Sequence, residues 1–358
     1  MGKVLVTEQS LQDIADSIRG KNGSSATYKP GQMSAAIDAI PTGGSSRPTT
    51  WAEFAAMTVS AQQKCYGVGD RVGIACSWKS PSNVTYPDIV WQIAGWGTTK
   101  KENDNTEYPC VTLVMMLLTD TSVQLDAPEN SVTATEETAQ EGIYYFGFNG
   151  SSYVALNLST GDTIPYGDYN SVFKTDVTGN INYFNDIRQY GYNVYKYSAI
   201  RQWLNSDAAN NWWQASHVGD VAPSNTNQPG FMNGLNSDFK AILQRTEVVT
   251  AGNNVTDDGS TYSTYDYLFL PSSYEVYLSS SPVEGDRMDC YTAGGAVKNG
   301  LRALGPVSGG NPATWWLRSA NRGYAYSECN ITNRGAINYG NASGGYSVAA
   351  ACKIILAS

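Results

Sequence analysis

Apolar residues near the N-terminus recur at helical spacing in two short segments. The first set is Leu11, Ile14, Ala15 and Ile18, and the second is Met33, Ala36, Ile37 and Ile40, which ends at Pro41. This spacing places each set on one face of a helix, so residues 1–41 predict a helical hairpin. Helices this short cannot bury enough surface to be stable alone, so we expect them to pack on the next domain or on other copies of the chain. Residues 42–50 begin with TGGSSRP, a composition typical of a linker.

From residue 51 to residue 358 the pattern changes to short apolar runs separated by polar, turn-forming residues. Predicted strands are Ile89–Trp96, Val111–Leu118, Tyr267–Leu270, Tyr274–Leu278 and Val348–Leu356, with a hairpin formed by Ile143–Phe148 and Tyr153–Leu158. After a short opening helix at Trp51, helical spacing recurs in Tyr197–Asn205 and Asn236–Leu243. The sequence therefore predicts an α+β protein whose large domain is β-rich with two short helices.

The stretch from Arg318 to Ala349 differs from the apolar runs on either side of it. It contains five Asn, four Tyr, four Ser and five Gly, with few large aliphatic residues. Tyrosine offers a large contact area at low entropic cost, and Asn, Ser and Gly offer adaptable hydrogen bonding, as in antibody paratopes. The stretch is therefore either a solvated, turn-rich loop or a ligand-binding face.

Charge and composition exclude several classes of function. The net charge of −9 argues against general affinity for nucleic acid or anionic membranes, although the residues from Trp315 onward carry a local net charge of +3. The sequence contains neither a signal-peptide pattern nor an apolar run long enough to span a membrane. The six scattered cysteines show no CxxC spacing, which predicts free thiols in a protein made in a cytoplasm.

The sequence also offers little for catalysis or for metal binding. His217 is the only histidine, and no nucleophile motif surrounds it. Cys352 lies in an apolar run and Cys329 is not part of a cysteine pair, so both are expected to be inert. Asp257–Asp258 and Asn103–Asn105 could supply oxygen ligands to calcium, but such segments are more often polar turns. We expect no enzymatic activity, no cofactor and at most a structural calcium ion.

Two parts of the sequence resemble known families. The segment LVTEQSLQDIADSIRGKNGSSATYKPGQMSAAIDAIPTGG resembles the N-terminal segment of tail-associated structural proteins from phages and prophages of Gram-positive hosts. This resemblance covers about a tenth of the chain and implies attachment to a virion and to other tail proteins.

The second resemblance covers most of residues 51–358. It rests on SAIRQWLNSDAANNWW, GFMNGLNSDFKAILQRT, DYLFLPSSYEVYL and TWWLRSANRGYAY with YSVAAACKIIL, in that order. Together these motifs resemble a C-type lectin-like domain of the formylglycine-generating-enzyme type, as found on phage tail proteins and on variable proteins of diversity-generating retroelements. Residues 131–179 fit less well and are interpreted as an insertion. The resemblance implies a ligand-binding face at residues 318–347, which a retroelement diversifies where one is present.

The predicted contact residues and their frame follow from these observations. The contact residues are Asn321, Arg322, Tyr324, Tyr326, Glu328, Asn330, Asn333, Asn338, Tyr339, Asn341 and Tyr346. Trp315, Trp316 and Arg318 are assigned to the scaffold beneath them, with one tryptophan in the core and its neighbour half exposed, because adjacent strand residues point to opposite faces.

The expected function is receptor binding by a phage tail protein, located in the virion and made in the cytoplasm of the bacterial host. The expected ligand is a protein or a glycan of the host surface, and a homotrimer would strengthen weak individual contacts. We expect neither nucleic-acid binding nor membrane insertion. The main alternative is an undiversified tail protein that uses the domain for virion assembly, and an oxidase of the formylglycine-generating type is a third.

Overall fold

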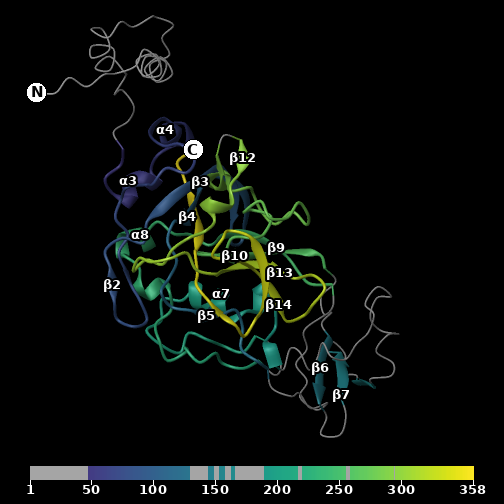
Figure 1. Cartoon of the computed structure of the whole chain (residues 1–358). Helices are drawn as coiled ribbons and strands as arrows, with labels where there is room; N and C mark the ends of the chain where they lie inside the picture. The colour runs from purple at the N-terminus through teal and green to yellow at the C-terminus, as the bar shows by residue number, and fades with distance from the viewer. Residues whose placement is uncertain are drawn as a thin grey trace, which may run out of the picture. The chain divides into compact units, whose positions relative to one another are not determined.

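The computed structural model describes residues 47–129, 144–148, 153–157, 163–165, 189–216, 220–254, 259–293 and 295–358 (Figure 1). Between residues 144 and 165 only the backbone is described. The predicted helical hairpin of residues 1–41, His217 and Asp257–Asp258 lie outside the described residues. The chain forms two compact units, one of Met1–Arg47 with Ser60–Cys65 and one of Pro48–Val59 with Tyr66–Ser358.

A five-stranded antiparallel sheet is the largest element of the second unit. Its strand order is β10-β9-β3-β4-β17, with β10 at Thr261–Asp266, β9 at Thr246–Ala251, β3 at Trp91–Lys101, β4 at Asp104–Met115 and β17 at Ala351–Ile355. A tight turn joins β3 to β4, and Asn103 there has a φ of 61°, a left-handed conformation that asparagine tolerates. The predicted strands around Ile93, Val111 and Ile354 are thus confirmed, and β3 and β4 are longer than expected because polar residues extend the hairpin.

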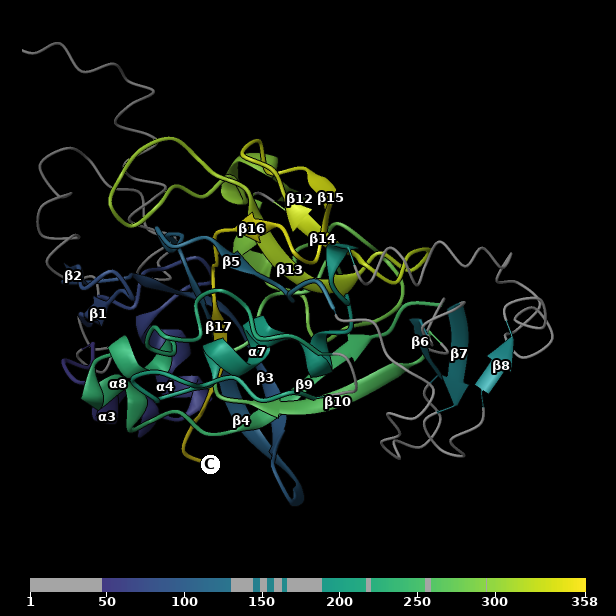
Figure 2. The ribbon, with the colours of Figure 1, turned by 90° about the horizontal axis from the view of Figure 1, so that it is seen from below.

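A second sheet contains the stretch that the sequence singled out. It has the order β13-β14-β15, with β13 at Trp315–Ala320, β14 at Ser327–Ile331 and β15 at Ile337–Asn341. The chain then forms β16 (Gly345–Tyr346), which pairs with β5 (Val123–Gln124). Figure 2 shows that this sheet and the five-stranded sheet occupy different parts of the unit.

Three smaller sheets complete the described strands. They are β1 (Trp78–Lys79) with β2 (Thr85–Tyr86), β11 (Thr292–Ala293) with β12 (Ala296–Val297), and β6 (Tyr144–Phe148), β7 (Tyr153–Asn157) and β8 (Thr163–Pro165). The antiparallel pairing of β6 with β7 confirms the hairpin predicted from the sequence.

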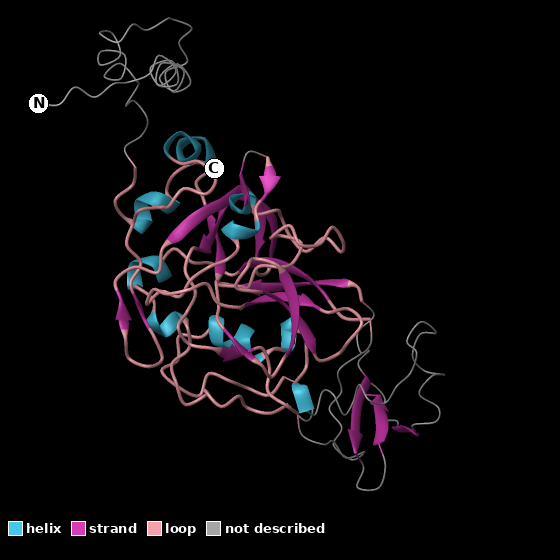
Figure 3. Ribbon diagram, viewed as in Figure 1, coloured by secondary structure: helices cyan, strands magenta, loops and turns pink. Residues whose placement is uncertain are grey.

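The helices of the second unit are short and begin at side-chain caps (Figure 3). They are α3 (Trp51–Ala55), α7 (Ala199–Leu204) and α8 (Ser237–Lys240), with α4 (Val59–Cys65) running into the first unit, and 3-10 turns lie at Tyr195–Tyr197, Met232–Gly234, Asp289–Tyr291 and Asn299–Leu301. Thr50 and Glu53 form a capping box at α3, and Ser198 and Asn236 cap α7 and α8. The predicted helices are confirmed in place, although α8 is half as long as its apolar spacing indicated.

Aromatic side chains pack the helices into the core of this unit. The Trp51 ring lies 4.6 Å from the Phe239 ring, and Phe239 lies 4.9 Å from Trp91 of β3. Trp203 of α7 contacts Phe231, with 5.3 Å between the ring centroids. Burial of rings of this size contributes much of the stability of such a domain.

Two predicted strands are wrong in the structure. Within Tyr267–Leu270 only Phe269 makes a β-bridge, to Ala351, and Tyr274–Leu278 is a turn in which Tyr277 has a φ of 62°. In the first segment the Tyr267 and Leu268 amides donate to the Asn205 side chain instead of to a strand. In the second, the Ser272 amide donates to the Glu275 carboxylate and the Glu275 amide donates to the Ser272 hydroxyl. Side chains that bond to nearby backbone favour a turn over a strand.

The protein is therefore α+β, β-rich with few and short helices. None of the helices in the described parts of the chain combines the length and the apolar character needed to cross a membrane.

Candidate ligand-binding site

Strand β13 forms a buried frame for the predicted site. All six of its residues are buried, and Trp315 and Trp316 have no exposed surface. The Trp315 indole donates to the carbonyl of Arg302 at 3.0 Å, and the Trp316 indole donates to the carbonyl of Val123 at 2.8 Å. The expectation that one tryptophan would be half exposed is wrong, because both sides of β13 are covered.

Arg318 fixes this frame to three other segments. Its guanidinium pairs with Glu275 in a two-pronged ion pair, with Nη1 2.5 Å from Oε2 and Nη2 3.0 Å from Oε1. It also donates to the carbonyls of Leu270, Val249 and Glu284. A buried charge is tolerated when it is paired and fully hydrogen-bonded, and Arg318 meets both conditions.

The structure places the predicted contact residues at three depths. Exposed residues are Tyr324, Asn333, Asn338, Tyr339 and Asn341, half-buried residues are Asn321, Arg322, Tyr326 and Tyr346, and buried residues are Glu328 and Asn330. Nine of the eleven predicted contact residues therefore have side chains that reach solvent, whereas Glu328 and Asn330 are enclosed.

Glu328 and Asn330 correct the sequence-based prediction. Both have no exposed surface, and none of their side-chain oxygen and nitrogen atoms has a hydrogen-bond partner among the described residues. The reason is that β14 lies between β13 and β15 with both of its faces covered, so even polar residues are enclosed. Burial, and then the neighbouring Glu284, raise the pKa of Glu328 well above its ordinary value.

The remaining tyrosines of the strands lie on two faces of this sheet. Tyr339 is paired with Cys329 in register, and both line the same pocket. Tyr346 lies over Gly340 and packs edge-on against Trp316, with 4.5 Å between ring centroids. Because successive strand residues point to opposite faces, the predicted contact residues do not form one continuous surface.

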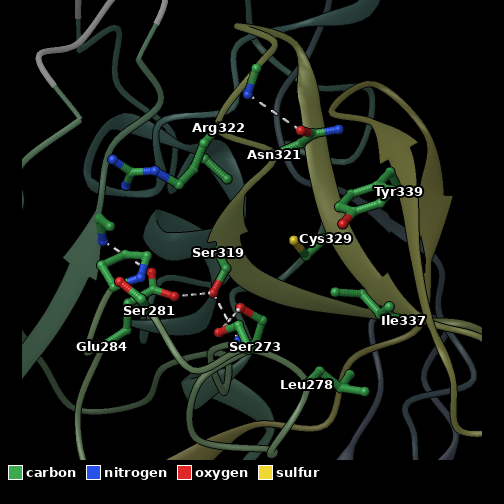
Figure 4. Close-up of a pocket in the computed structure, with 15 residues that line it drawn as sticks. Ser273, Leu278, Ser281, Glu284, Ser319, Asn321, Arg322, Cys329, Ile337 and Tyr339 are labelled. Carbon is green, nitrogen blue, oxygen red and sulfur yellow. Dashed lines mark hydrogen bonds between the residues drawn. The ribbon is translucent and has the colours of Figure 1, made fainter.

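A pocket with a volume of about 280 Å³ opens on the side of the sheet that carries Tyr339 (Figure 4). Of the predicted contact residues, Asn321, Arg322 and Tyr339 line it. Leu278 and Ile337 add apolar surface, and Cys329 contributes its thiol. Burial raises the pKa of the Cys329 thiol well above its ordinary value, so the sulfur is a poor nucleophile there.

One side of the pocket comes from a segment that the sequence did not identify. Ser273, Ser279, Ser281 and Glu284 all line it, and they belong to the turns that follow Pro271. The only signal in the sequence was a cluster of serines, two within the motif DYLFLPSSYEVYL and three directly after it, and serine clusters are common in plain turns.

Glu284 lies at the base of the pocket and is almost fully buried. Its Oε1 accepts a hydrogen bond from the Ala251 amide at 3.0 Å, and its Oε2 accepts one from the Ser319 hydroxyl at 2.5 Å. Ser319 Oγ in turn accepts from the Ser273 amide at 2.8 Å. Burial raises the pKa of Glu284, while the charge of Arg318 acts in the opposite direction.

Arg322 is held at the rim of the pocket. Its guanidinium donates to the carbonyls of Gly252 and Gly259 and to the amide oxygen of Asn254. Figure 4 shows this side chain directed away from Tyr339. Arg322 therefore ties the loop after β13 to the neighbouring loop.

Metal-binding side chains do not gather in the part of the chain that the structure describes. No group of three or more His, Cys, Asp or Glu residues there could hold a metal ion. Of the two calcium candidates, Asp104 accepts hydrogen bonds from the Thr106 amide and the Tyr108 hydroxyl and so stabilises the β3–β4 turn.

Comparison with known proteins identifies one family. No curated protein and no solved structure matches the chain. The sequence model of one protein family matches residues 171–355, more than half of the chain, including the pocket and the β13-β14-β15 sheet. The chain therefore belongs to the family described as a domain of unknown function, DUF6273.

Proposed function

We propose that this protein binds a host-surface ligand as part of a phage tail, through a C-type lectin-like domain and without catalysis. One observation carries the proposal. Asn321, Arg322 and Tyr339, which the composition marked as contact residues, meet at one pocket beside a fully buried strand. A rigid frame that holds exposed aromatic and amide side chains in place is the usual arrangement of a binding surface.

The positions of the four quoted motifs support the lectin-like fold. They fall on α7, on the 3-10 turn at Met232–Gly234 with α8, on the turns around Pro271, and on β13 with β17. All of these lie in the second unit of the chain. The four motifs occur in the same order as in that family, and they lie in one compact unit. Both facts favour a single domain of the lectin-like type.

Binding at one site would be weak, so we propose that several copies act together. A pocket of this size buries little surface, and simultaneous engagement by a homotrimer would raise the apparent affinity without new contacts. The N-terminal segment of residues 1–41 would attach the protein to other tail proteins in the virion.

The alternative is a tail protein that uses the same domain only for virion assembly. Diversification of the gene separates the two proposals. A near-copy of the last codons that differs at adenines and lies beside a reverse transcriptase gene would favour the diversified binder.

Binding of the labelled protein to host cells tests the proposal directly. We expect wild-type protein to label the cells, and Tyr339→Ala to weaken labelling by about tenfold, because exposed tyrosines at a binding surface contribute strongly. Asn311→Ala is the matched control, since Asn311 is exposed but lies outside the pocket. Incorporation of wild-type protein into virions together with no labelling of cells would contradict receptor binding and favour assembly.

A further inference from the structure

The base of the pocket is a buried carboxylate with unused acceptor capacity. Glu284 accepts one hydrogen bond at each oxygen, from the Ala251 amide and the Ser319 hydroxyl. An ionised carboxylate offers about four acceptor positions, so about half of them remain. Since Glu284 also lines the pocket, a ligand that reaches the base meets this carboxylate.

The charges near Glu284 are not balanced. Arg318 makes its ion pair with Glu275, and it bonds to Glu284 at the backbone carbonyl, while its charge acts on the Glu284 carboxylate from a distance. Burial and the charge of Glu284 raise the pKa of Glu328 well above its ordinary value, which favours the neutral form of that carboxyl group. The charge of Arg318 is therefore matched by Glu275, and Glu284 makes no ion pair among the described residues.

The rim does not correct this imbalance. Arg322 uses its guanidinium on the oxygens of Gly252, Asn254 and Gly259, and it is directed away from Tyr339 in Figure 4. The other polar side chains of the lining are uncharged: the hydroxyls of Ser273, Ser279, Ser281, Ser319 and Tyr339, the Asn321 amide and the Cys329 thiol. A cation would thus find acceptors in the pocket, whereas an anion would face Glu284.

The shape and the remaining lining limit the size of such a cation. A volume of about 280 Å³ holds one sugar ring or the end of one long side chain. Leu278 and Ile337 offer apolar surface to a ring or a stem, and the half-exposed ring of Tyr339 stands at the mouth. A primary ammonium donates three hydrogen bonds and is attracted to the face of an aromatic ring.

We propose that this pocket binds a compact polar ligand through a protonated primary amine, with Glu284 as its anchor and Tyr339 at the mouth. The inference rests on the proposed function, because the amine would belong to the host-surface ligand. An amino sugar of a glycan and a lysine side chain share this chemistry. The lining of the pocket favours a primary amine, and titration with both kinds of amine distinguishes an amino sugar from a lysine side chain.

Titration of wild-type protein with matched amines and amides, followed by calorimetry or by NMR shifts, tests the inference without any mutation. The probes are D-glucosamine against N-acetyl-D-glucosamine, and a lysine tripeptide against the same peptide acetylated at Nζ. We expect one amine to bind at least about tenfold more tightly than its acetylated partner, because acetylation removes a charge-assisted hydrogen bond. Equal affinity within both pairs, or no binding of either amine, overturns the inference.

Two variants locate the binding in the pocket. Tyr339→Ala should weaken amine binding by about threefold or more, whereas Tyr267→Ala should leave it unchanged, because Tyr267 is a partly exposed tyrosine outside both the lining and the predicted contact residues. Glu284→Gln should abolish the preference for the amine over the amide, provided that its thermal unfolding shows a folded protein. Equal effects of the two tyrosine replacements overturn the assignment to this pocket.

Failure of this inference and failure of the proposed function give different results. If cells are labelled but no amine binds or competes, the protein is a receptor-binding protein with another ligand. If an amine binds in the pocket but cells are not labelled, the amine site is supported and the proposal of receptor binding is contradicted.

Discussion

Strands β13 and β15 flank β14 in one small sheet, yet they have opposite characters. Every residue of β13 is buried, and Arg318 links it to three other segments. In β15 every residue is exposed or half buried, and the strand is held in the sheet by its antiparallel pairing with β14. Both are outer strands of the sheet, but the backbone of β13 also bonds to Ser347 and Pro271 beyond the sheet, whereas β15 pairs within the sheet with β14 alone.

Two strands within forty residues of sequence therefore have two different roles, one structural and one in presenting side chains. The buried strand β13 sets the position of its neighbours, and the exposed strand β15 presents side chains that can change without disturbing the core. Strand β14 belongs with β13 in this respect, since its polar residues Glu328 and Asn330 are enclosed. Substitutions should therefore have effects that depend on the strand and not on the polarity of the residue.

Replacement of Arg318 should have the largest effect. Arg318→Ala leaves Glu275 buried without its partner, and removing one member of a buried ion pair costs about 3–5 kcal/mol of unfolding free energy. Urea unfolding followed by tryptophan fluorescence measures this change. Arg322→Ala is the control, because Arg322 is half buried, and we expect it to cost about 1 kcal/mol. Similar costs for both variants would remove the distinction between frame and rim.

The turn between β14 and β15 should be the next most sensitive position. Gly335 has a φ of 75°, and an added Cβ would lie 1.8 Å from the carbonyl oxygen of Asn299. Gly335→Ala should therefore destabilise the protein by about 2–3 kcal/mol, since both strain and a clash arise. Gly309→Ala is the matched control, because its φ of 88° carries the same strain but nothing lies within 4 Å of the added atom. If both variants lose equal stability, the close approach of Asn299 is not important.

Some of this architecture was readable from the sequence. Apolar spacing located α7 and the strands β3, β4 and β17, because those residues have one dominant partner surface. Composition located the stretch that contains β14 and β15 and predicted its exposed tyrosines, Tyr324 and Tyr339.

The rest depended on tertiary contacts that leave no local signal. Glu328 and Asn330 look like surface residues, and they are enclosed only because tertiary packing covers both faces of β14. Glu284 joins the pocket from a segment more than thirty residues earlier in the chain than Ser319, with which it shares a hydrogen bond. Polar residues in turns do not indicate by themselves which pocket they will line.

Glu328 should make stability depend on pH. Because its pKa is raised in the folded protein, the folded state binds the proton more tightly than the unfolded chain does. The resulting stability is fully present below the unfolded-state pKa of about 4.3 and is lost as the pH rises through the folded-state pKa.

Glu328→Gln should remove this loss. We expect the variant to be more stable than wild type by about 1–2 kcal/mol at pH 8, with the difference shrinking toward pH 4. Thermal unfolding of both proteins across this range measures the effect. A constant difference at all pH values would indicate that Glu328 is not the group that titrates.

The exposed tyrosines should have the smallest effect on stability. Tyr324→Ala and Tyr339→Ala should each change the unfolding free energy by less than about 0.5 kcal/mol, because about half of each side chain already contacts solvent. Tyr346→Ala is the informative comparison, since that ring packs on Trp316 and its loss should cost about 1–2 kcal/mol. A large loss at Tyr339 would mean that β15 contributes to the frame, and the distinction between the two strands would then fail at a residue that lines the proposed amine site.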